Sequence, residues 1–293
     1  MASLPKPATR RIGETGGLSG IRLAALDFDG TLVPKDVPNA DLNDRTAALL
    51  EQLRCRGLQL IVATGRHPSF IQKRIRKFQF DAVIGYSGNV VSHGRQKEAA
   101  SFSLDMIQAV YAFAQNNPGL EMTLYSDQGI ACGSSSESRE ALLKKWRRTD
   151  RICDLNGVAD FLIGDVQKVT TMQISRICLH LDRWELYPQI RTEFLSRFPG
   201  YRLVKTGDKQ AEVLVQGRSK ASEILRLAHS LGISADQIAC AGDDENDIEM
   251  LQLFDHSYYI GRNDDPLRSA AAFCADHVNA VLEQLLIKGE SHV

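Results

Sequence analysis

Two aspartates separated by a single residue are the first feature of this chain that could do chemistry. Asp27 and Asp29 follow the short apolar run 23–26, and Gly30 comes next and allows a sharp turn. The run predicts a buried parallel strand, so both acids would lie at the carboxyl end of a strand, where open α/β sheets bind ligands. Two carboxylates this close are costly to ionise together unless a cation or a shared proton intervenes. The pair therefore indicates a metal, a proton-transfer role, or both.

Two plainer interpretations of this pair are a solvated turn and a calcium loop. Asp and Gly are ordinary turn residues, so the pair by itself does not exclude a turn. An EF-hand loop does not fit this stretch. Its glycine belongs at the sixth position of the loop, whereas here Gly30 stands at the fourth position and Thr31 at the fifth. The choice depends on whether the rest of the chain supplies matching groups.

A second strand end carries a hydroxyl group. The apolar run 58–63 is followed by Thr64, Gly65 and Arg66, and Pro68 suits the first position of the next helix. The cap of that helix then falls directly before Pro68 and not at Thr64, so we predict that the Thr64 hydroxyl contacts a ligand. Arg66 has two candidate roles, which are binding phosphate and pairing with a core carboxylate.

Further charged residues open two predicted helices. Lys220 begins a helix that stops at Gly232, although the helix dipole disfavours a cation there; the alternative to a functional role is a solvated lysine. The apolar run 237–242 ends in four acids within 243–247. Acids stabilise a helix N-terminus, but this accounts for one or two of them, and Ile248 excludes a calcium loop by standing where its glycine belongs.

These groups are expected to meet at one edge of one sheet. Each follows a core strand or opens a helix, and right-handed crossovers bring such positions to the same edge. Acids from adjacent strands can hold Mg²⁺ through oxygen ligands, while the Thr64 hydroxyl and Lys220 can donate to a dianionic phosphoryl group. The sequence therefore predicts a phosphoryl-transfer site.

Composition narrows the class of protein. With 293 residues, 43% of them hydrophobic, the chain can bury a large core and form one large or two smaller domains. The net charge of −1 gives no bias toward nucleic acid, and the basic clusters 73–77 and 144–148 are interpreted as wet faces of helices. Six scattered cysteines without zinc spacing indicate a reduced, cytoplasmic protein, and no apolar stretch predicts a signal peptide or a membrane span. No pattern indicates an oligomeric state.

The order of the expected strands and helices divides the chain into segments. Residues 1–20 are predicted to be a flexible leader, and short strands alternate with helices over 21–86 and 216–293. The pattern over 87–215 is hairpin-like and predicts an inserted α+β domain. Within it we expect a hairpin over 121–132, a strand over 169–181, and helices over 103–116, 137–148 and 184–197.

Four ordered motifs resemble those of the haloacid dehalogenase superfamily. They are D-x-D-G-T-L at 27–32, T-G-R at 64–66, the lysine at 220 that opens a helix, and G-D-x-x-N-D-x-x-M at 242–250. The large insert is similar to the C2-type cap of the Cof-like sugar phosphatases, subfamily IIB. The resemblance covers about residues 21–290 and implies an α/β fold with a Rossmann-like parallel-sheet core, a mobile α+β cap that chooses the substrate, and Mg²⁺ as cofactor.

The resemblance also implies roles for the acids. Asp27 would be the nucleophile that forms an aspartyl-phosphate, with one oxygen on the metal. Asp29 would act as general acid and base through its carboxyl group and bind the metal through its backbone carbonyl. Asp243 would be a metal ligand, and Asn246 and Asp247 would support the metal site.

The phosphate side of the site follows from the same resemblance. Thr64, Gly65 and Lys220 would hold the transferring phosphoryl group, and Lys220 would also orient Asp27. The chain departs from the family at 87–89, where Ser-Gly-Asn replaces an Asn-Gly-Ala-like turn near the cap hinge or the pocket rim. No residue of the cap is singled out as a substrate contact.

The predicted activity is that of a Mg²⁺-dependent phosphatase acting on small phosphorylated metabolites, such as sugar or polyol phosphates. A phosphomutase or phosphotransferase that shares the same residues is one alternative. A metabolite-binding regulator without turnover is another, although the complete set of Asp27, Asp29, Lys220 and Asp243 argues against it.

Overall fold

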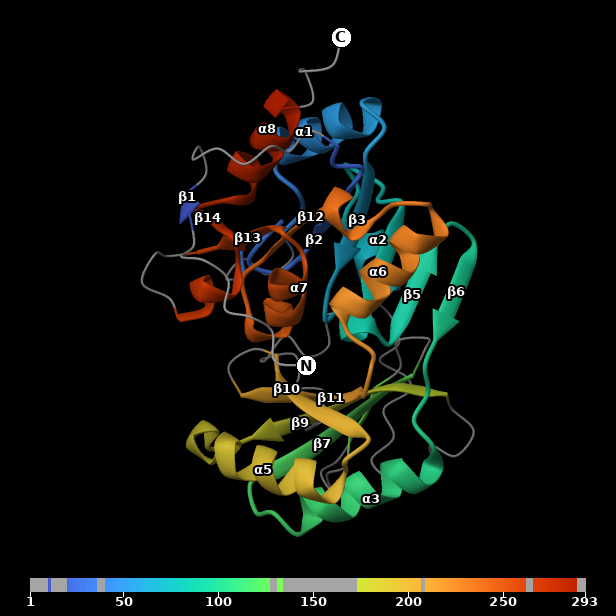
Figure 1. Ribbon diagram of the computed structural model, residues 1–293. Coiled ribbons are helices and arrows are strands. Elements are labelled where there is room, and N and C mark those ends of the chain that lie inside the picture. Colours follow the sequence, from blue (N-terminus) through green and yellow to red (C-terminus); the bar gives the residue numbers. More distant parts are fainter. Residues whose placement is uncertain are drawn as a thin grey trace.

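The computed structural model describes residues 10–11, 20–35, 40–126, 131–133, 173–206, 209–261 and 266–288. Within these ranges the chain forms a nine-stranded sheet and a five-stranded sheet, which lie one above the other in Figure 1. Helices pack on both sheets, so the predicted α/β fold class is confirmed. The expected helix over 137–148, with its basic cluster 144–148, lies outside the described residues.

The nine-stranded sheet is largely parallel. In spatial order its described strands are β1 (Arg10–Arg11), β14 (Phe273–Ala275), β13 (His256–Ile260), β12 (Ile238–Gly242), β2 (Leu23–Leu26), β3 (Gln59–Ala63), β4 (Ala82–Gly85), β5 (Val90–His93) and β6 (Gln96–Ala99). The first seven strands in this spatial order, from β1 at the edge to β4, run parallel to their neighbours. Strand β5 pairs with β4, and β6 with β5, in the antiparallel direction. The chain winds from β2 through β3 to β4 on one side and places β12 to β14 on the other. The crevice between two such halves is where a doubly wound sheet binds ligands.

Strand β2 shows why both faces of this sheet are covered. Leu23 and Ala25 belong to one buried cluster, whereas Ala24 and Leu26 belong to another, because successive side chains of a strand point to opposite faces. Helices α6 (Lys220–Ser230) and α7 (Ile248–Leu253) pack on the first face, and α1 (Asp44–Cys55), α2 (Pro68–Arg74) and α8 (Val278–Lys288) pack on the second. A strand that is buried on both faces reads as a continuous apolar run.

Helix α2 begins where the sequence predicts and ends sooner. Pro68 occupies its first turn and His67 is its N-cap. It ends at Arg74, because the backbone of Ile75 is extended, so the basic cluster 73–77 is helical only at its start. The wet helical face that we predicted there is therefore shorter than the cluster.

The five-stranded sheet is antiparallel throughout. Its described strands, in spatial order, are β10 (Tyr201–Lys205), β11 (Gln210–Val215), β9 (Ile174–Leu181), β7 (Leu120–Ser126) and β8 (Ala131–Gly133). Helix α3 (Leu104–Gln115) and helix α5 (Tyr187–Arg197), which follows the turn η5 (Trp184–Leu186), cover the face that points away from the larger sheet (Figure 1). Edge-to-face contacts of Phe113 with Phe194 and Phe198 tie the two helices together. The other face is left to meet the larger sheet.

Strands β5 and β6 belong to the larger sheet, although our predicted insert 87–215 includes them. Their hairpin pairs with β4, and Val91 lies opposite Ile84. We propose that the inserted cap begins after β6 and ends at about residue 215. In the leader, β1 pairs with β14, and the rest of residues 1–19 lies outside the described residues.

Candidate active site

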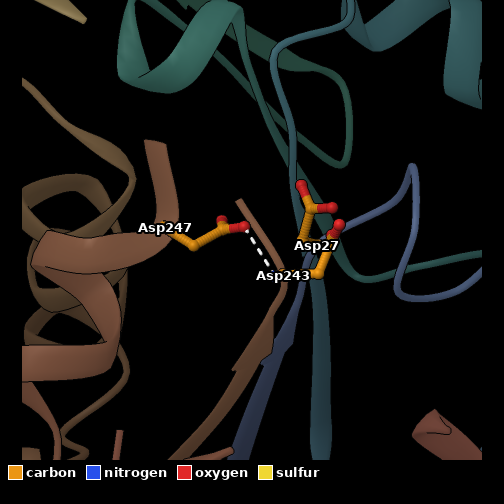
Figure 2. Close-up of side chains that lie close together, drawn as sticks. All are labelled: Asp27, Asp243 and Asp247. Carbon is orange, nitrogen blue, oxygen red and sulfur yellow. Dashed lines mark hydrogen bonds between the residues drawn. The ribbon is translucent and has the colours of Figure 1, made fainter. Parts of the chain in front are cut away.

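Three neighbouring strands end in the residues that the sequence singled out. β12, β2 and β3 lie side by side and are followed by Asp243, Asp27 and Thr64, respectively. The Asp27 N–H continues the ladder by donating to the carbonyl oxygen of Ala241 at 2.9 Å. Figure 2 shows Asp27 and Asp243 leaving adjacent strands with their carboxylates close together. The parallel register thus brings residues more than 200 positions apart to one place.

Among the described residues, Asp27, Asp243 and Asp247 form a group of acids whose ligand atoms lie within 4.8 Å of one another. Burial raises the pKa of Asp27 well above its ordinary value despite the nearby Lys220. Burial and the charge of Asp247 raise the pKa of Asp243 to about 6. Both shifts have the same cause, which is that buried negative charges repel one another and lack water. The cluster therefore favours uptake of a cation, and its all-oxygen donor set suits Mg²⁺.

Lys220 lies inside this cluster. Its Nζ donates to Asp27 Oδ1 at 2.6 Å and to Asp247 Oδ1 at 2.7 Å, and the residue is only 1% exposed. Burial disfavours the ammonium form, but Asp247 and Asp27 outweigh burial and raise the pKa of Lys220 above its usual range. The alternative of a solvated lysine is excluded. Ser219 caps helix α6 through a capping box and so fixes where Lys220 begins the helix.

Asp247 holds the loop that carries Asp243. Its Oδ2 accepts the N–H groups of Asp243 at 3.0 Å and Asp244 at 3.1 Å, and Figure 2 marks the first of these bonds. The loop passes so close that a Cβ on Gly242 would lie 2.5 Å from Asp247 Cγ. The acids after β12 thus have different tasks, since Asp247 orients the backbone while the Asp243 carboxylate faces Asp27.

Asp29 faces a different partner. Its carboxylate accepts hydrogen bonds from Arg66 Nε at 2.9 Å and Nη2 at 3.2 Å. Arg66 therefore pairs with a core carboxylate, which is one of the two roles that the sequence left open. This fork-like contact fixes the direction of the Asp29 carboxylate.

The loop after Asp29 contributes a lysine that sequence reasoning missed. Lys35 Nζ lies 2.5 Å from Asp243 Oδ2 and 3.1 Å from Asp244 Oδ2. No local pattern marks Lys35, because its position depends on how the loop folds back over β12. Gly30 permits that fold with a φ of +91°, and a Cβ there would lie 2.3 Å from Asp243 Oδ2.

Thr64 and Gly65 lie on the other side of Asp27. The Thr64 hydroxyl is buried and accepts the Arg66 N–H at 3.1 Å, so its own hydrogen can still be donated. The point where a Cβ on Gly65 would lie is 3.7 Å from Ser87 Oγ and 3.8 Å from Asn246 Nδ2. Asn246 is thus brought to the phosphate side of the predicted site.

A cavity of about 330 Å³ borders this side of the site. Ser87, Lys220 and Asn246 line it from the larger sheet, and Arg202 and Val204 line it from the five-stranded sheet. The cavity therefore lies between the two sheets, next to the Lys220 that contacts the acid cluster.

A model of the haloacid dehalogenase-like hydrolases matches residues 24–283. The chain belongs to this family. Among similar proteins of the family, the HMP-PP phosphatase of Citrobacter koseri is 29% identical over 244 residues, which are 82% of this chain and 84% of that protein. The HMP-PP phosphatase of Escherichia coli O6:H1 is 27% identical over 254 residues, covering 85% and 87%. The predicted family resemblance is confirmed, and the names of these relatives support the predicted class of phosphoric monoester hydrolase.

Solved structures of other proteins share the fold. The subclass IIB sugar phosphatase BT4131 superposes with a TM-score of 0.71 at 18% identity, covering 91% of this chain and 99% of that one. The protein SMU.1108c from Streptococcus mutans UA159 gives 0.75 at 18% identity, covering 91% and 98%.

Two further features concern the helices and the cysteines of the chain. Over the described part of the chain, no helix has both the length and the apolar character needed to cross a membrane. Cys55, Cys178, Cys240 and Cys274 form no disulfide.

Proposed function

We propose that the protein is a Mg²⁺-dependent phosphatase that hydrolyses small phosphorylated metabolites through an aspartyl-phosphate on Asp27. The observation that carries this proposal is the contact of the buried Lys220 with Asp27 inside a group of three acids. A nucleophilic carboxylate needs a partner that orients it and a counter-charge for the anion it attacks, and this arrangement supplies both.

Mg²⁺ fits the residues that are present. The carboxylates of Asp27 and Asp243 would hold it, together with the backbone carbonyl of Asp29, and Asp247 would support the loop beneath. The raised pKa of the buried Asp243 carboxyl group marks a site that gains from a cation. When bound, Mg²⁺ would neutralise negative charge on the phosphoryl group.

The residues of the chain divide the remaining work. Asp27 forms the new bond to phosphorus as the bond from phosphorus to the leaving oxygen breaks. Asp29, whose two carboxylate oxygens accept from Arg66, first takes up a proton from solvent, gives it to that oxygen, and then takes one from the water that releases phosphate. The Thr64 hydroxyl, the Gly65 backbone and Lys220 donate to the phosphoryl oxygens.

We infer the substrate class from the relatives and from the cavity. Two relatives are named HMP-PP phosphatases and one similar structure is named a sugar phosphatase. The cavity of about 330 Å³ is polar and small, which suits a sugar, a polyol or a single ring as the leaving group. We expect the reaction to take place in the cytoplasm, since Cys55, Cys178, Cys240 and Cys274 form no disulfide.

The test is phosphate release from a panel of sugar, polyol and nucleotide monophosphates and one organic diphosphate, with and without Mg²⁺. We expect metal-dependent release that falls about 10³-fold or more in Asp27→Asn, because the nucleophile is lost. Release that survives in Asp27→Asn would contradict the mechanism. A folded, Mg²⁺-binding protein that releases no phosphate but moves it to a second hydroxyl would instead be the phosphotransferase of the alternative prediction.

A further inference from the structure

The turn after β4 has a backbone that side chains rarely adopt. Tyr86 has a φ of +46° and Ser87 a φ of +51°, and neither is glycine. Residues in this region persist only where their surroundings hold them, and they concentrate at functional sites. The Ser87 N–H donates to the carbonyl oxygen of Thr64 at 3.0 Å, so the turn is fixed to the phosphate side of the active site.

The same turn contacts the five-stranded sheet. Ser87 Oγ donates to Glu212 Oε2 at 2.7 Å, and Asn89 Nδ2 donates to the Ser175 carbonyl oxygen at 3.0 Å. The Tyr86 ring centre lies 5.2 Å from Cζ of Arg176. The strained turn is therefore the place where strands β9 and β11 dock onto the larger sheet.

Arg176 of β9 is the charged side chain that this docking brings to the site. Its Nε lies 3.1 Å from Glu212 Oε1, and its Cζ lies over the rings of Tyr86 and Tyr125. Arg176 is 5% exposed and Glu212 is fully buried. Its Nη2 lies 4.0 Å from the point where a Cβ on Gly65 would be. The guanidinium thus reaches the side of Gly65 that also meets Ser87 and Asn246.

Stability alone gives a weak reason for this arrangement. A buried ion pair costs so much desolvation that apolar residues of similar size often serve as well. A guanidinium matches the geometry of phosphate oxygens better than any other side chain. A buried arginine that is aimed beside a phosphate-binding glycine therefore points to a ligand.

We propose that Arg176 binds a phosphate oxygen of the substrate beside Gly65, and that Glu212 and Ser87 position its guanidinium. The inference rests on the proposed function, and it adds a substrate contact that comes from the cap. The anion site is then complete only while the five-stranded sheet is docked on the turn. Substrate binding is therefore coupled to closure of the cap.

The test measures binding of inorganic phosphate by calorimetry in the presence of Mg²⁺. Arg176→Gln alone leaves Glu212 buried without a partner and endangers folding, so the main variant also carries Glu212→Gln. We expect phosphate affinity to fall about tenfold or more in this double variant and less in Arg176→Lys, with Mg²⁺ affinity unchanged. The matched control is Arg197→Gln, which removes an exposed cap arginine in the last turn of α5, outside the cavity lining. Its phosphate affinity is expected to stay within about twofold of the wild type.

Glu212→Gln alone separates positioning from simple charge. Removing a negative charge near an anion site would by itself tighten phosphate binding. If Glu212 positions Arg176, phosphate binding weakens instead. Tighter binding in this variant would overturn the role of Glu212.

Three results would overturn the role of Arg176. They are unchanged phosphate affinity in folded Arg176 variants, an equal loss in Arg197→Gln, and a wild type that does not bind phosphate. The last result would also contradict the proposed function, whereas the first two, seen with an active wild type, would contradict this inference alone. Thermal unfolding of each variant shows whether it is folded.

Discussion

At the scale of single residues, the clustered acids of the site outnumber the lysines that contact them. Asp27, Asp243 and Asp247 lie within reach of one ion. Lys220 contacts Asp27 and Asp247, and Lys35 contacts Asp243. Each lysine neutralises part of the repulsion, and each also occupies oxygens of the acids. Clustering buried acids lowers the stability of the fold, but it leaves a position that a cation and a phosphoryl group can fill.

A substitution at Gly30 would test how closely its backbone must approach Asp243. Gly30→Ala is expected to cost about 1 kcal/mol for its left-handed backbone and also to displace the Asp243 carboxylate. The matched control is Gly57→Ala, where φ is +84° and nothing lies near the added Cβ. Both variants should unfold more easily, but only Gly30→Ala should lose the rise in unfolding temperature that Mg²⁺ gives the wild type. Equal responses to Mg²⁺ in the two variants would show that the contact with Asp243 does not matter.

At the scale of elements, the ends of β12, β2 and β3 and the start of α6 do the positioning. The strands fix the acids and Thr64 through their ladder, and the helix fixes Lys220 through its cap. Ser219 Oγ accepts the Ser222 N–H at 3.1 Å and also donates to Glu249 Oε1 at 2.8 Å. The first turn of α6 is therefore held from inside the helix and from α7.

Ser219→Ala is expected to lower the unfolding free energy by about 1 kcal/mol, because the N-cap is lost, and to lower kcat because Lys220 loosens. Ser103 is the N-cap of α3, far from the site, and its side chain accepts the Met106 N–H at 3.2 Å. Ser103→Ala should cost similar stability and leave kcat unchanged. Denaturant unfolding and phosphate release measure both quantities. A kcat that falls equally in both variants would mean that general stability, and not the placement of Lys220, limits turnover.

At the scale of the whole molecule, the strained turn at 86–89 joins two sheets that otherwise have separate cores. The larger sheet and the five-stranded sheet each bury their own apolar clusters. Polar contacts connect them, among them Ser87 with Glu212 and Arg202 with Glu249. Contacts of this kind separate and re-form more easily than a shared apolar core.

Amide hydrogen exchange should show this coupling. Phosphate with Mg²⁺ is expected to slow exchange at the N–H groups of Ser87 and Asn89, which bond within the turn and to Thr64. The amides of α3, on the far side of the cap, serve as the internal control and should not change (Figure 1). Slowing spread evenly over both regions would indicate general stabilisation and not docking at the turn.

The sequence by itself determined the class of the fold and the order of the chemical groups. Apolar runs that end in Asp27, Thr64 and Asp243 predicted strands, and parallel strands with right-handed crossovers present their carboxyl ends at one edge. The roles of Pro68 and Gly30 could be predicted from the sequence, because their effects on the backbone depend on little beyond the neighbouring residues.

The tertiary structure alone decided which side chains meet across long separations. Arg66 pairs with Asp29, Lys35 folds over Asp243, and the hairpin β5–β6 joins the larger sheet. Arg176 reaches Gly65 only because two sheets dock, and residues 111 positions apart in the chain share no local pattern. Periodicity encodes which face of an element is buried, but the partner of a polar side chain is set by the packing of whole elements.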